Sequence, residues 1–198
     1  MSLTGATASE FPFSTKEPET YQGDFIATAG QTGDRTFVAR KGDKWRFDIY
    51  NGADLSLTQI RNDKLYVVDH QKKVYAAMPE NPDAVSHNVH DITAVLFNGK
   101  EYRDFDEIGR ESGLIKYKVR ATKYSKGDIF ISIDLASGMI VREEFADSIG
   151  ENEEQPADSF IFEIRNLKLE VDDSVFAIPA GYRKVTWDEY RAMRQKNK

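Results

Sequence analysis

The sequence contains no cysteine, and this absence excludes disulfide bonds, thiolate catalysis and zinc sites built on cysteine. It also has no run of about eighteen apolar residues, so it predicts no membrane-spanning helix. The first residues, MSLTGATASEF, lack the apolar stretch of an export signal. The chain is therefore expected either to stay in the cytoplasm or to follow an export signal that has been removed.

The signatures of common enzyme classes are missing as well. No G-x-S-x-G elbow, Walker loop or dinucleotide-binding glycine pattern occurs. Acidic residues outnumber basic ones by 33 to 27, giving a formal net charge of −6, and no Lys/Arg cluster accompanies a nucleic-acid reader motif. We therefore predict no catalytic residues, no cofactor and no nucleic-acid partner.

One pattern has the spacing of metal ligands. His87 and His90 would lie on roughly one face of a helix with Asp91 alongside, and His70 is the third histidine. A metal site of this kind usually needs a third or fourth ligand from elsewhere. The apolar stripe that starts at Val85 favours polar residues on the solvent side of the helix, so no metal is predicted. Whether the two histidines bind anything else is left open.

What the sequence has in abundance is short strands. Hydrophobic residues make up 40% of the chain and aromatic residues 12%, as is typical of a globular sheet protein with a large core. Trp45, Phe47 and Ile49 alternate with polar residues, which indicates a strand with one apolar face. Turn dipeptides such as Asn51-Gly52 separate it from its neighbours. About ten or eleven strands joined in this way predict an antiparallel sheet.

The periodicity divides the chain into three parts. Residues 1–20 have no period and are predicted to be a flexible N-terminal segment. Residues 21–185 are predicted to form one half-barrel domain, because nothing inside them has the composition of a linker. Residues 186–198 are predicted to form a short basic helix, opened by a capping box of Thr186 and Glu189.

One amphipathic helix interrupts the strands at about residues 82–97. Asn81 suits the N-cap, Pro82 suits the first helical position, and Asn98-Gly99 ends the pattern. Because a sheet of so many strands must curl, we predict a mainly β (α+β) fold in which a strongly curved antiparallel sheet forms an incomplete barrel. The helix would lie against its concave side as a lid or plug.

The large apolar side chains of the sheet and the helix would individually be core residues. As a set they lie where a curved sheet meets a single helix, and one helix need not fill the whole concave side. The remaining space would be a dry pocket suited to an acyl chain. The predicted pocket residues are Trp45, Phe47, Ile49, Tyr66, Val68, Tyr75 and Phe130 from the strands and Val85, Val89, Ile92 and Leu96 from the helix.

The order of these segments is similar to that of a known family. Over about residues 21–185 the chain resembles the LolA/LolB-like lipoprotein carriers of the bacterial envelope, in the run TFVARKGDKWRFDIY, the hairpin RNDKLYVVDHQKKVYAAMP, the lone helix, the second group of strands and the run VFAIPAGYRKV. The resemblance implies an unclosed barrel with a helical lid over a cavity for lipoprotein acyl chains. It implies that Arg40 tethers the lid, although Lys41 stands where the family has proline. It also implies a place in the periplasm or at the outer membrane.

Two functions follow as hypotheses. The first is non-enzymatic binding, and transfer, of an acyl chain of a lipoprotein or lipid in the cell envelope. The second is a sensor or scaffold module that docks another envelope protein with the same fold. Two sequence features suggest this docking module. The segment 146–158 has five acidic residues and no basic one, and residues 186–198 at the end of the chain are basic.

Overall fold

The computed structural model of the chain describes residues 12, 18–29, 32–79, 102–121, 128–146 and 160–195. The helix predicted at 82–97 and the acidic segment 146–158, except Ala146, lie outside these residues. The described elements are β1 (Thr20–Ala29), β2 (Thr32–Lys41), β3 (Lys44–Asn51), β4 (Asp54–Arg61), β5 (Leu65–Asp69), β6 (Val74–Ala77), β7 (Tyr102–Glu111), β8 (Leu114–Ala121), β9 (Asp128–Asp134), β10 (Ile140–Ala146), β11 (Phe160–Lys168), the 3-10 helix η1 (Asp173–Phe176), β12 (Arg183–Lys184) and helix α2 (Trp187–Gln195).

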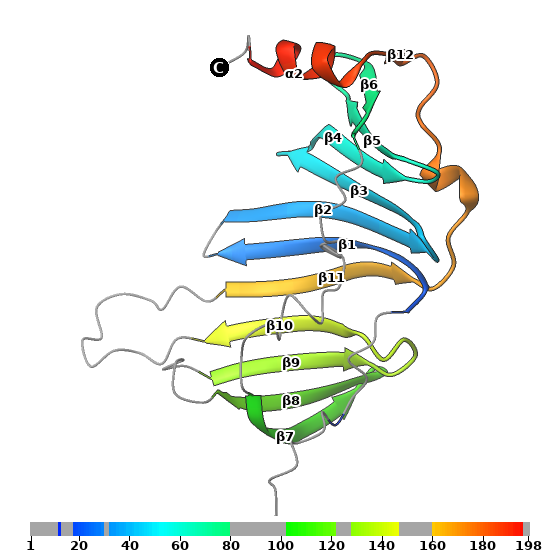
Figure 1. Cartoon of the computed structure of the whole chain (residues 1–198). Helices are drawn as coiled ribbons and strands as arrows, with labels where there is room; N and C mark the ends of the chain where they lie inside the picture. Colours follow the sequence, from blue (N-terminus) through cyan, green and yellow to red (C-terminus); the bar gives the residue numbers. More distant parts are fainter. Residues whose placement is uncertain are drawn as a thin grey trace, which may run out of the picture. The chain divides into compact units, whose positions relative to one another are not determined.

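The strands form one sheet in the order β12-β6-β5-β4-β3-β2-β1-β11-β10-β9-β8-β7 (Figure 1). The described strands are not closed into a barrel, because β12 and β7 stand at the two ends of this order. The prediction of a mainly β chain with an incomplete barrel is therefore confirmed. One detail differs from a purely antiparallel sheet, since β12 runs parallel to β6. The chain reaches β12 through the long segment 169–182 rather than through a hairpin, and only a hairpin would force the antiparallel direction.

The chain divides into two compact units. Unit 1 comprises residues 1–17 and 91–161, and unit 2 comprises residues 18–90 and 162–198. Strands β7 to β10 belong to unit 1, whereas β1 to β6, β12, η1 and α2 belong to unit 2. The single domain predicted over 21–185 stays a prediction, and each unit is described by itself below.

The turns of unit 2 are those that the sequence predicts. Gly42 and Gly52 have positive φ angles of 60° and 62°, which a side chain at either position would disfavour. The hairpins that they close set the register of β2, β3 and β4. Directly paired residues point to the same side of a sheet. We call face A the side that bears Val38, Phe47 and Gln59, and face B the side that bears Phe37, Asp48 and Thr58.

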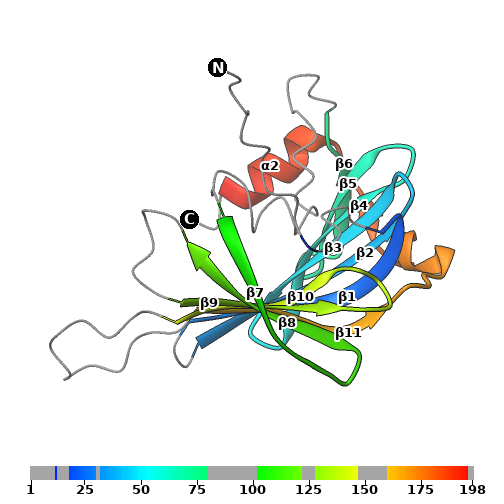
Figure 2. The same cartoon turned by 90° about the horizontal axis from the view of Figure 1, so that it is seen from below.

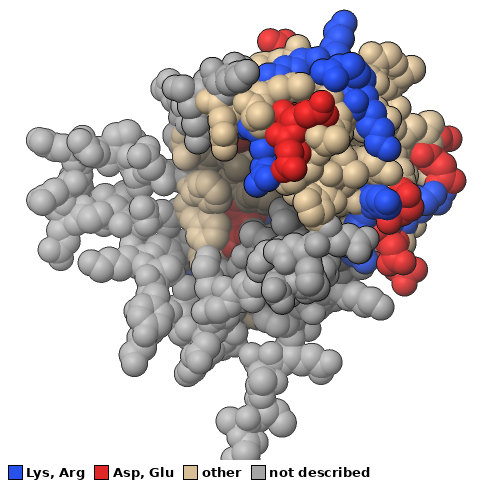
Figure 3. All heavy atoms as spheres, turned by 45° about the horizontal axis from the view of Figure 1, so that its top comes forward, with Lys and Arg blue, Asp and Glu red and all other residues tan. Residues whose placement is uncertain are grey.

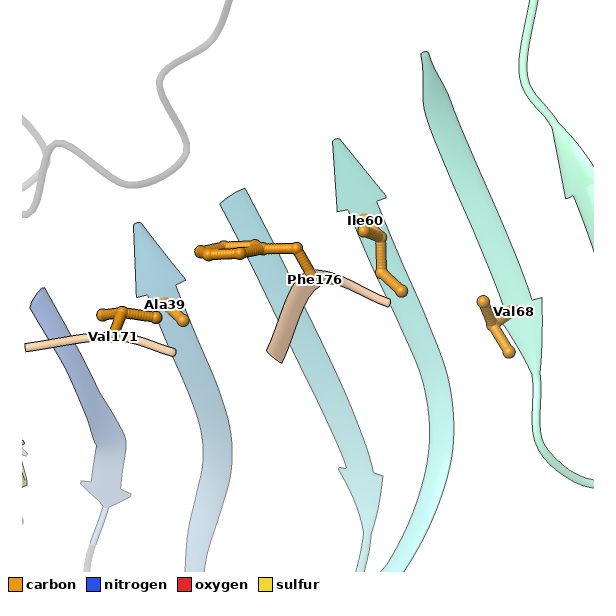
Figure 4. Close-up of a cluster of buried hydrophobic side chains, with 5 residues drawn as sticks. All are labelled: Ala39, Ile60, Val68, Val171 and Phe176. Carbon is orange, nitrogen blue, oxygen red and sulfur yellow. The ribbon is translucent and has the colours of Figure 1, made fainter. Parts of the chain in front are cut away.

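A segment from the C-terminal part of the chain covers face B. Val171 and Phe176 are buried against Ala39, Ile60 and Val68 of the strands (Figure 4). Helix η1 begins after Asp172, whose carboxylate accepts a hydrogen bond of 2.8 Å from the backbone N–H of Ser174. The Asp173 carboxylate lies 3.0 Å from Lys44 Nζ and 3.1 Å from Lys41 Nζ. Both contacts lower the pKa of the Asp173 carboxyl, and the contact with Lys44 lowers it most.

Helix α2 packs on the other side of the same unit, at β6 (Figure 2). The predicted capping box is present, because Thr186 N–H donates to Glu189 Oε2 at 2.7 Å and Glu189 N–H donates to Thr186 Oγ1 at 3.2 Å. Tyr190 is buried, and burial raises the pKa of its hydroxyl. Together with Val185 it packs against Val67, Val74 and Ala76. Val67 and Ala76 are in register with Gln59, so α2 lies on face A.

Unit 1 is built on rows of β-branched side chains. Ile129, Ile131 and Ile133 of β9 are buried and lie on one side of its sheet. Glu143 of β10 is in register with Ile131 and is also buried. Strand β7 has two irregularities in its pairing with β8, and such bulges are common at sheet edges.

Candidate functional site

Three predicted pocket residues lie together on face A. Trp45 and Phe47 of β3 are half-buried, and Ile49 is 36% exposed. Phe47 is in register with Val38, and Ile49 is in register with Leu57. These side chains therefore form an apolar row along β3 that continues onto its neighbours.

Apolar side chains of face A continue from β2 through β1 to β11. Tyr21 and Phe25 are buried, and both lie on face A because they pair with Arg40 and Thr36 of β2. The Phe25 ring meets the Phe162 ring edge-on, with 6.0 Å between the ring centroids. Edge-on aromatic pairs of this kind add attraction beyond the apolar area that they bury. Face A thus extends from Phe162 across β1, β2 and β3, with α2 at its β6 end.

The two strands β1 and β11 approach closely at Gly23, and this contact is testable. A Cβ at Gly23 would lie 3.0 Å from Ile164 Cγ2 and 3.3 Å from the Arg165 carbonyl oxygen. We expect Gly23→Ala to lower the free energy of unfolding by about 1–3 kcal/mol, since overpacking displaces neighbours. In Gly33→Ala the new Cβ would lie 3.4 Å from its nearest neighbour, Thr28 Oγ1, so little loss is expected. Urea unfolding measures both, and equal losses would contradict the close approach.

Tyr66, Val68 and Tyr75 lie on face B, which corrects the prediction that they share a pocket with Trp45. Val68 is in register with Thr58 and Tyr75, and Tyr66 is in register with Ile60. Val68 is fully buried beneath the C-terminal segment, and Tyr75 packs against the same cluster. The apolar residues of β5 and β6 occupy both sides of these strands because both sides are covered, by α2 on one and by residues 171–182 on the other.

The remaining predicted residues lie in unit 1 or outside the described part of the chain. Phe130 lies in unit 1, where the Lys118 ammonium is 5.9 Å from its ring centroid. It points away from the buried row of Ile129 and Ile131. The helix residues and two of the histidines lie outside the described residues: Val85, Val89, Ile92, Leu96, His87 and His90.

Arg40, the predicted lid tether, lies on face A. It is in register with Trp45 on one side and with Tyr21 on the other. Its Nε donates a hydrogen bond of 3.3 Å to the carbonyl of Gly42 in the adjacent turn. Its role toward residues 82–97 stays a prediction.

Face B carries a chain of polar side chains that the sequence did not reveal. Arg46 Nε donates to Asp48 Oδ1 at 2.9 Å, and Thr58 Oγ1 lies 2.5 Å from the same oxygen. Thr58 Oγ1 lies 2.8 Å from His70 Nε2, and His70 Nδ1 lies 2.8 Å from the Tyr182 hydroxyl. This chain crosses from β3 to the residue that precedes β12. It therefore connects the C-terminal segment to the sheet.

The burial of these polar side chains on face B determines the protonation state of His70. Asp48 is 3% exposed and Thr58 is fully buried, so Thr58 presents no hydroxyl to a solute. Burial lowers the pKa of His70 below its usual value, against smaller raising effects of Asp48 and Asp69. His70 is thus neutral at pH 7. The only sequence signal for the chain was the pair Asp48 and Thr58, each a polar residue inside a strand.

The described residues contain no group of three or more His, Asp or Glu placed to hold a metal ion. Neither is any helix among them long and apolar enough to cross a membrane.

Comparison with known proteins gives structural matches only. No family model matches the sequence, and no curated protein does. The MucA/MucB complex of Pseudomonas aeruginosa contains a chain that matches with 11% identity and a TM-score of 0.51. The match covers 84% of this chain and 58% of that one. At this identity the likeness shows the fold alone.

Two further matches have lower TM-scores. An uncharacterized conserved protein from Thermus thermophilus is 9% identical, with 87% of this chain and 92% of that chain covered and a TM-score of 0.48. A LolA superfamily protein from Nitrosomonas europaea is 12% identical, with 85% and 92% covered and a TM-score of 0.32. A LolA superfamily protein is thus one of the structures to which this chain is similar.

Proposed function

We propose that this chain binds the acyl chain of a lipid or lipoprotein in the bacterial cell envelope, periplasmic or at the outer membrane, without catalysing a reaction. The observation that carries the proposal is the apolar row on face A, where half-buried Trp45 and Phe47 adjoin the exposed Ile49. The order of segments that resembles the LolA/LolB-like carriers supports the same function. Transfer of the bound chain between membranes or proteins belongs to this proposal.

The cover of the ligand is proposed to come from residues 82–97. Their apolar stripe would close over the acyl chain, and Arg40 would hold the lid from its place beside Trp45. Each buried CH₂ contributes about 0.8 kcal/mol, so contact with ten carbons supplies about 8 kcal/mol before ordering costs. Without those costs this amount would correspond to a dissociation constant of about 1 µM, so the measured binding should be weaker than that and reversible.

Tryptophan emission tests the proposal. The chain has two tryptophans, so Trp187→Phe leaves Trp45 as the sole reporter. Titration with dodecanoate should shift its emission to shorter wavelength and saturate. Absence of a shift, together with absence of lipid in an organic extract of the purified protein, would contradict acyl binding.

The two faces predict different results for matched substitutions. Ile49→Gln places an amide on face A at an exposed position, so it should weaken dodecanoate binding at least tenfold with little loss of stability. Tyr66→Gln changes a half-buried residue of face B and should leave binding unchanged. Calorimetric titration of both variants makes the comparison. Equal weakening by the two variants would place the ligand elsewhere.

A second candidate is docking of another envelope protein. The match to a chain of the MucA/MucB complex favours it, because that fold occurs in a protein–protein complex. The acidic segment 146–158 and the basic residues of 186–198 are opposite in sign, and the face that includes α2 shows basic side chains beside acidic ones (Figure 3). An assembly held by these charges should dissociate in about 0.5 M salt, whereas acyl binding should persist. Size-exclusion chromatography at low and high salt separates the two candidates.

A further inference from the structure

The polar chain on face B has a fixed direction of donation. A carboxylate only accepts hydrogen bonds, so the single proton of Thr58 Oγ1 is used at Asp48 Oδ1. Arg46 Nε donates to the same oxygen, and its Nη1 donates to the Val175 carbonyl at 3.0 Å. The Thr58 oxygen is thereby left as an acceptor. Its partner at 2.8 Å, His70 Nε2, must carry the proton.

The state of the second ring nitrogen follows. A neutral imidazole has one N–H, so Nδ1 of His70 has a lone pair and accepts from the Tyr182 hydroxyl at 2.8 Å. The order of donation is therefore Tyr182 to His70 to Thr58 to Asp48. Every hydroxyl and ring proton in the chain is placed, and only the neutral ring with its proton on Nε2 satisfies all of the contacts.

We propose that the hydrogen-bonded side chains of Tyr182, His70, Thr58 and Asp48 form an acid-sensitive clasp. A second proton on His70 turns Nδ1 from an acceptor into a donor and so breaks the hydrogen bond that anchors Tyr182. The imidazolium and the Tyr182 hydroxyl would then each present a proton to the other. The Tyr182 side chain must then rotate or move away, and the polypeptide segment that follows Tyr182 loosens.

The consequence reaches β12 and α2. The next links to the sheet are the bonds from Arg183 N–H to the Lys73 carbonyl and from Val185 N–H to the Tyr75 carbonyl, each 2.9 Å. Beyond them, α2 covers Val67, Val74 and Ala76 on face A. Loosening at Tyr182 therefore increases the fraction of time for which this end of face A is open. The clasp acts in this way whatever face A binds.

Burial, which is the largest effect, and the charges around His70 together set the pH at which the clasp acts. From β3, Asp48 favours the charged ring and Arg46 opposes it, and from the end of β5 Asp69 favours it. Asp69 is itself held by the Lys72 backbone N–H at 2.9 Å and by its ammonium at 3.5 Å. The other elements against the ring supply uncharged groups, Thr58 from β4 and the Tyr182 hydroxyl. Burial is the largest effect, and it lowers the pKa.

The sign of the pH dependence follows from this lowered pKa. Above the ordinary value of about 6.5 the ring is neutral in both the closed and the loosened segment. Between pH 6.5 and the lower pKa that His70 has in the closed form, the loosened form binds more protons than the closed form. Acid therefore favours loosening. The ratio of loosened to closed changes by up to tenfold for each unit by which the pKa is lowered. The clasp is complete above pH 6.5 and weakens as the pH falls through that window.

Nuclear magnetic resonance of the intact chain tests the clasp. The ¹⁵N shifts of neutral His70 should report a proton on Nε2. Protection of the Arg183 and Val185 amides, corrected for intrinsic exchange, should fall several-fold between pH 7.5 and pH 5 with the midpoint at the pKa of His70. Amides of β8 and β9 in unit 1 should show no such step. A neutral ring with its proton on Nδ1, or no step at Arg183 and Val185, would overturn the proposal.

Three variants separate the clasp from general acid loosening. His70→Gln keeps a donor and an acceptor but does not titrate, so the step should disappear. Tyr182→Phe removes the anchor itself, so protection should be reduced at all pH values, again without a step. His87→Gln with His90→Gln alters the two other histidines, and the step should remain. A step that survives in His70→Gln or in Tyr182→Phe would refute the proposal.

Discussion

Phe176→Ala is expected to lower the free energy of unfolding by about 3–5 kcal/mol, because the substitution opens a cavity at the centre of face B. Phe176 is 1% exposed and packs with Ala39, Ile60 and Val68 (Figure 4). It is also the last residue of η1, so its ring is the main apolar attachment of that turn to the sheet. The Phe176 carbonyl accepts a hydrogen bond of 2.8 Å from Asn62 Nδ2, and this backbone contact survives the substitution.

Urea unfolding of Phe176→Ala measures the loss, with Leu169→Ala as its control. Leu169 lies in the same C-terminal segment and is 41% exposed, so its truncation should cost less than about 1 kcal/mol. Proteolysis after residue 171 should also become faster in the Phe176 variant, since the segment loses its apolar anchor. A loss below about 1 kcal/mol in Phe176→Ala would mean that the segment is dispensable for the fold of unit 2.

The strands and turns of unit 2 were predictable because their signals are local. Alternation in Lys44–Tyr50 and glycine at positions 42 and 52 determine the β2–β3 and β3–β4 hairpins without reference to the rest of the chain. The capping box at Thr186 is local in the same way. Strand β12 has two residues and no period, so it became visible only through its bonds to β6.

The assignment of side chains to faces was less predictable. Alternation tells that Trp45 and Phe47 share a face, but only the register across β4 and β5 shows that Val68 lies on the other one. Nothing in the sequence pairs His70 with Tyr182, which are 112 positions apart. Long-range polar contacts have no periodic signal, so such contacts emerge from the fold alone.

Replacement of Asp48 by alanine is the second change with a large expected effect. Asp48 is 3% exposed and accepts bonds from Arg46 and Thr58. Its removal leaves a guanidinium and a hydroxyl without their acceptor, and removing one partner of a buried ion pair typically costs about 3–5 kcal/mol. The double variant Arg46→Met with Asp48→Leu leaves no charge unpaired. It should therefore lose less stability than Asp48→Ala, in urea unfolding at pH 8 where His70 is neutral.

Asp48→Ala also tests the direction of hydrogen-bond donation among the polar side chains on face B. Without the carboxylate, the proton of Thr58 Oγ1 is free to point toward His70 Nε2, and the ring is then free to carry its own proton on Nδ1 and donate to Tyr182. Asp48→Ala should therefore shift neutral His70 toward the Nδ1–H form, as read from its ¹⁵N shifts. In Thr58→Val the hydroxyl is absent, so the Asp48 carboxylate cannot set the tautomer of His70 through it. If Asp48→Ala unfolded no more readily than the double variant and kept the proton on Nε2, Asp48 could not be the group that orients the ring.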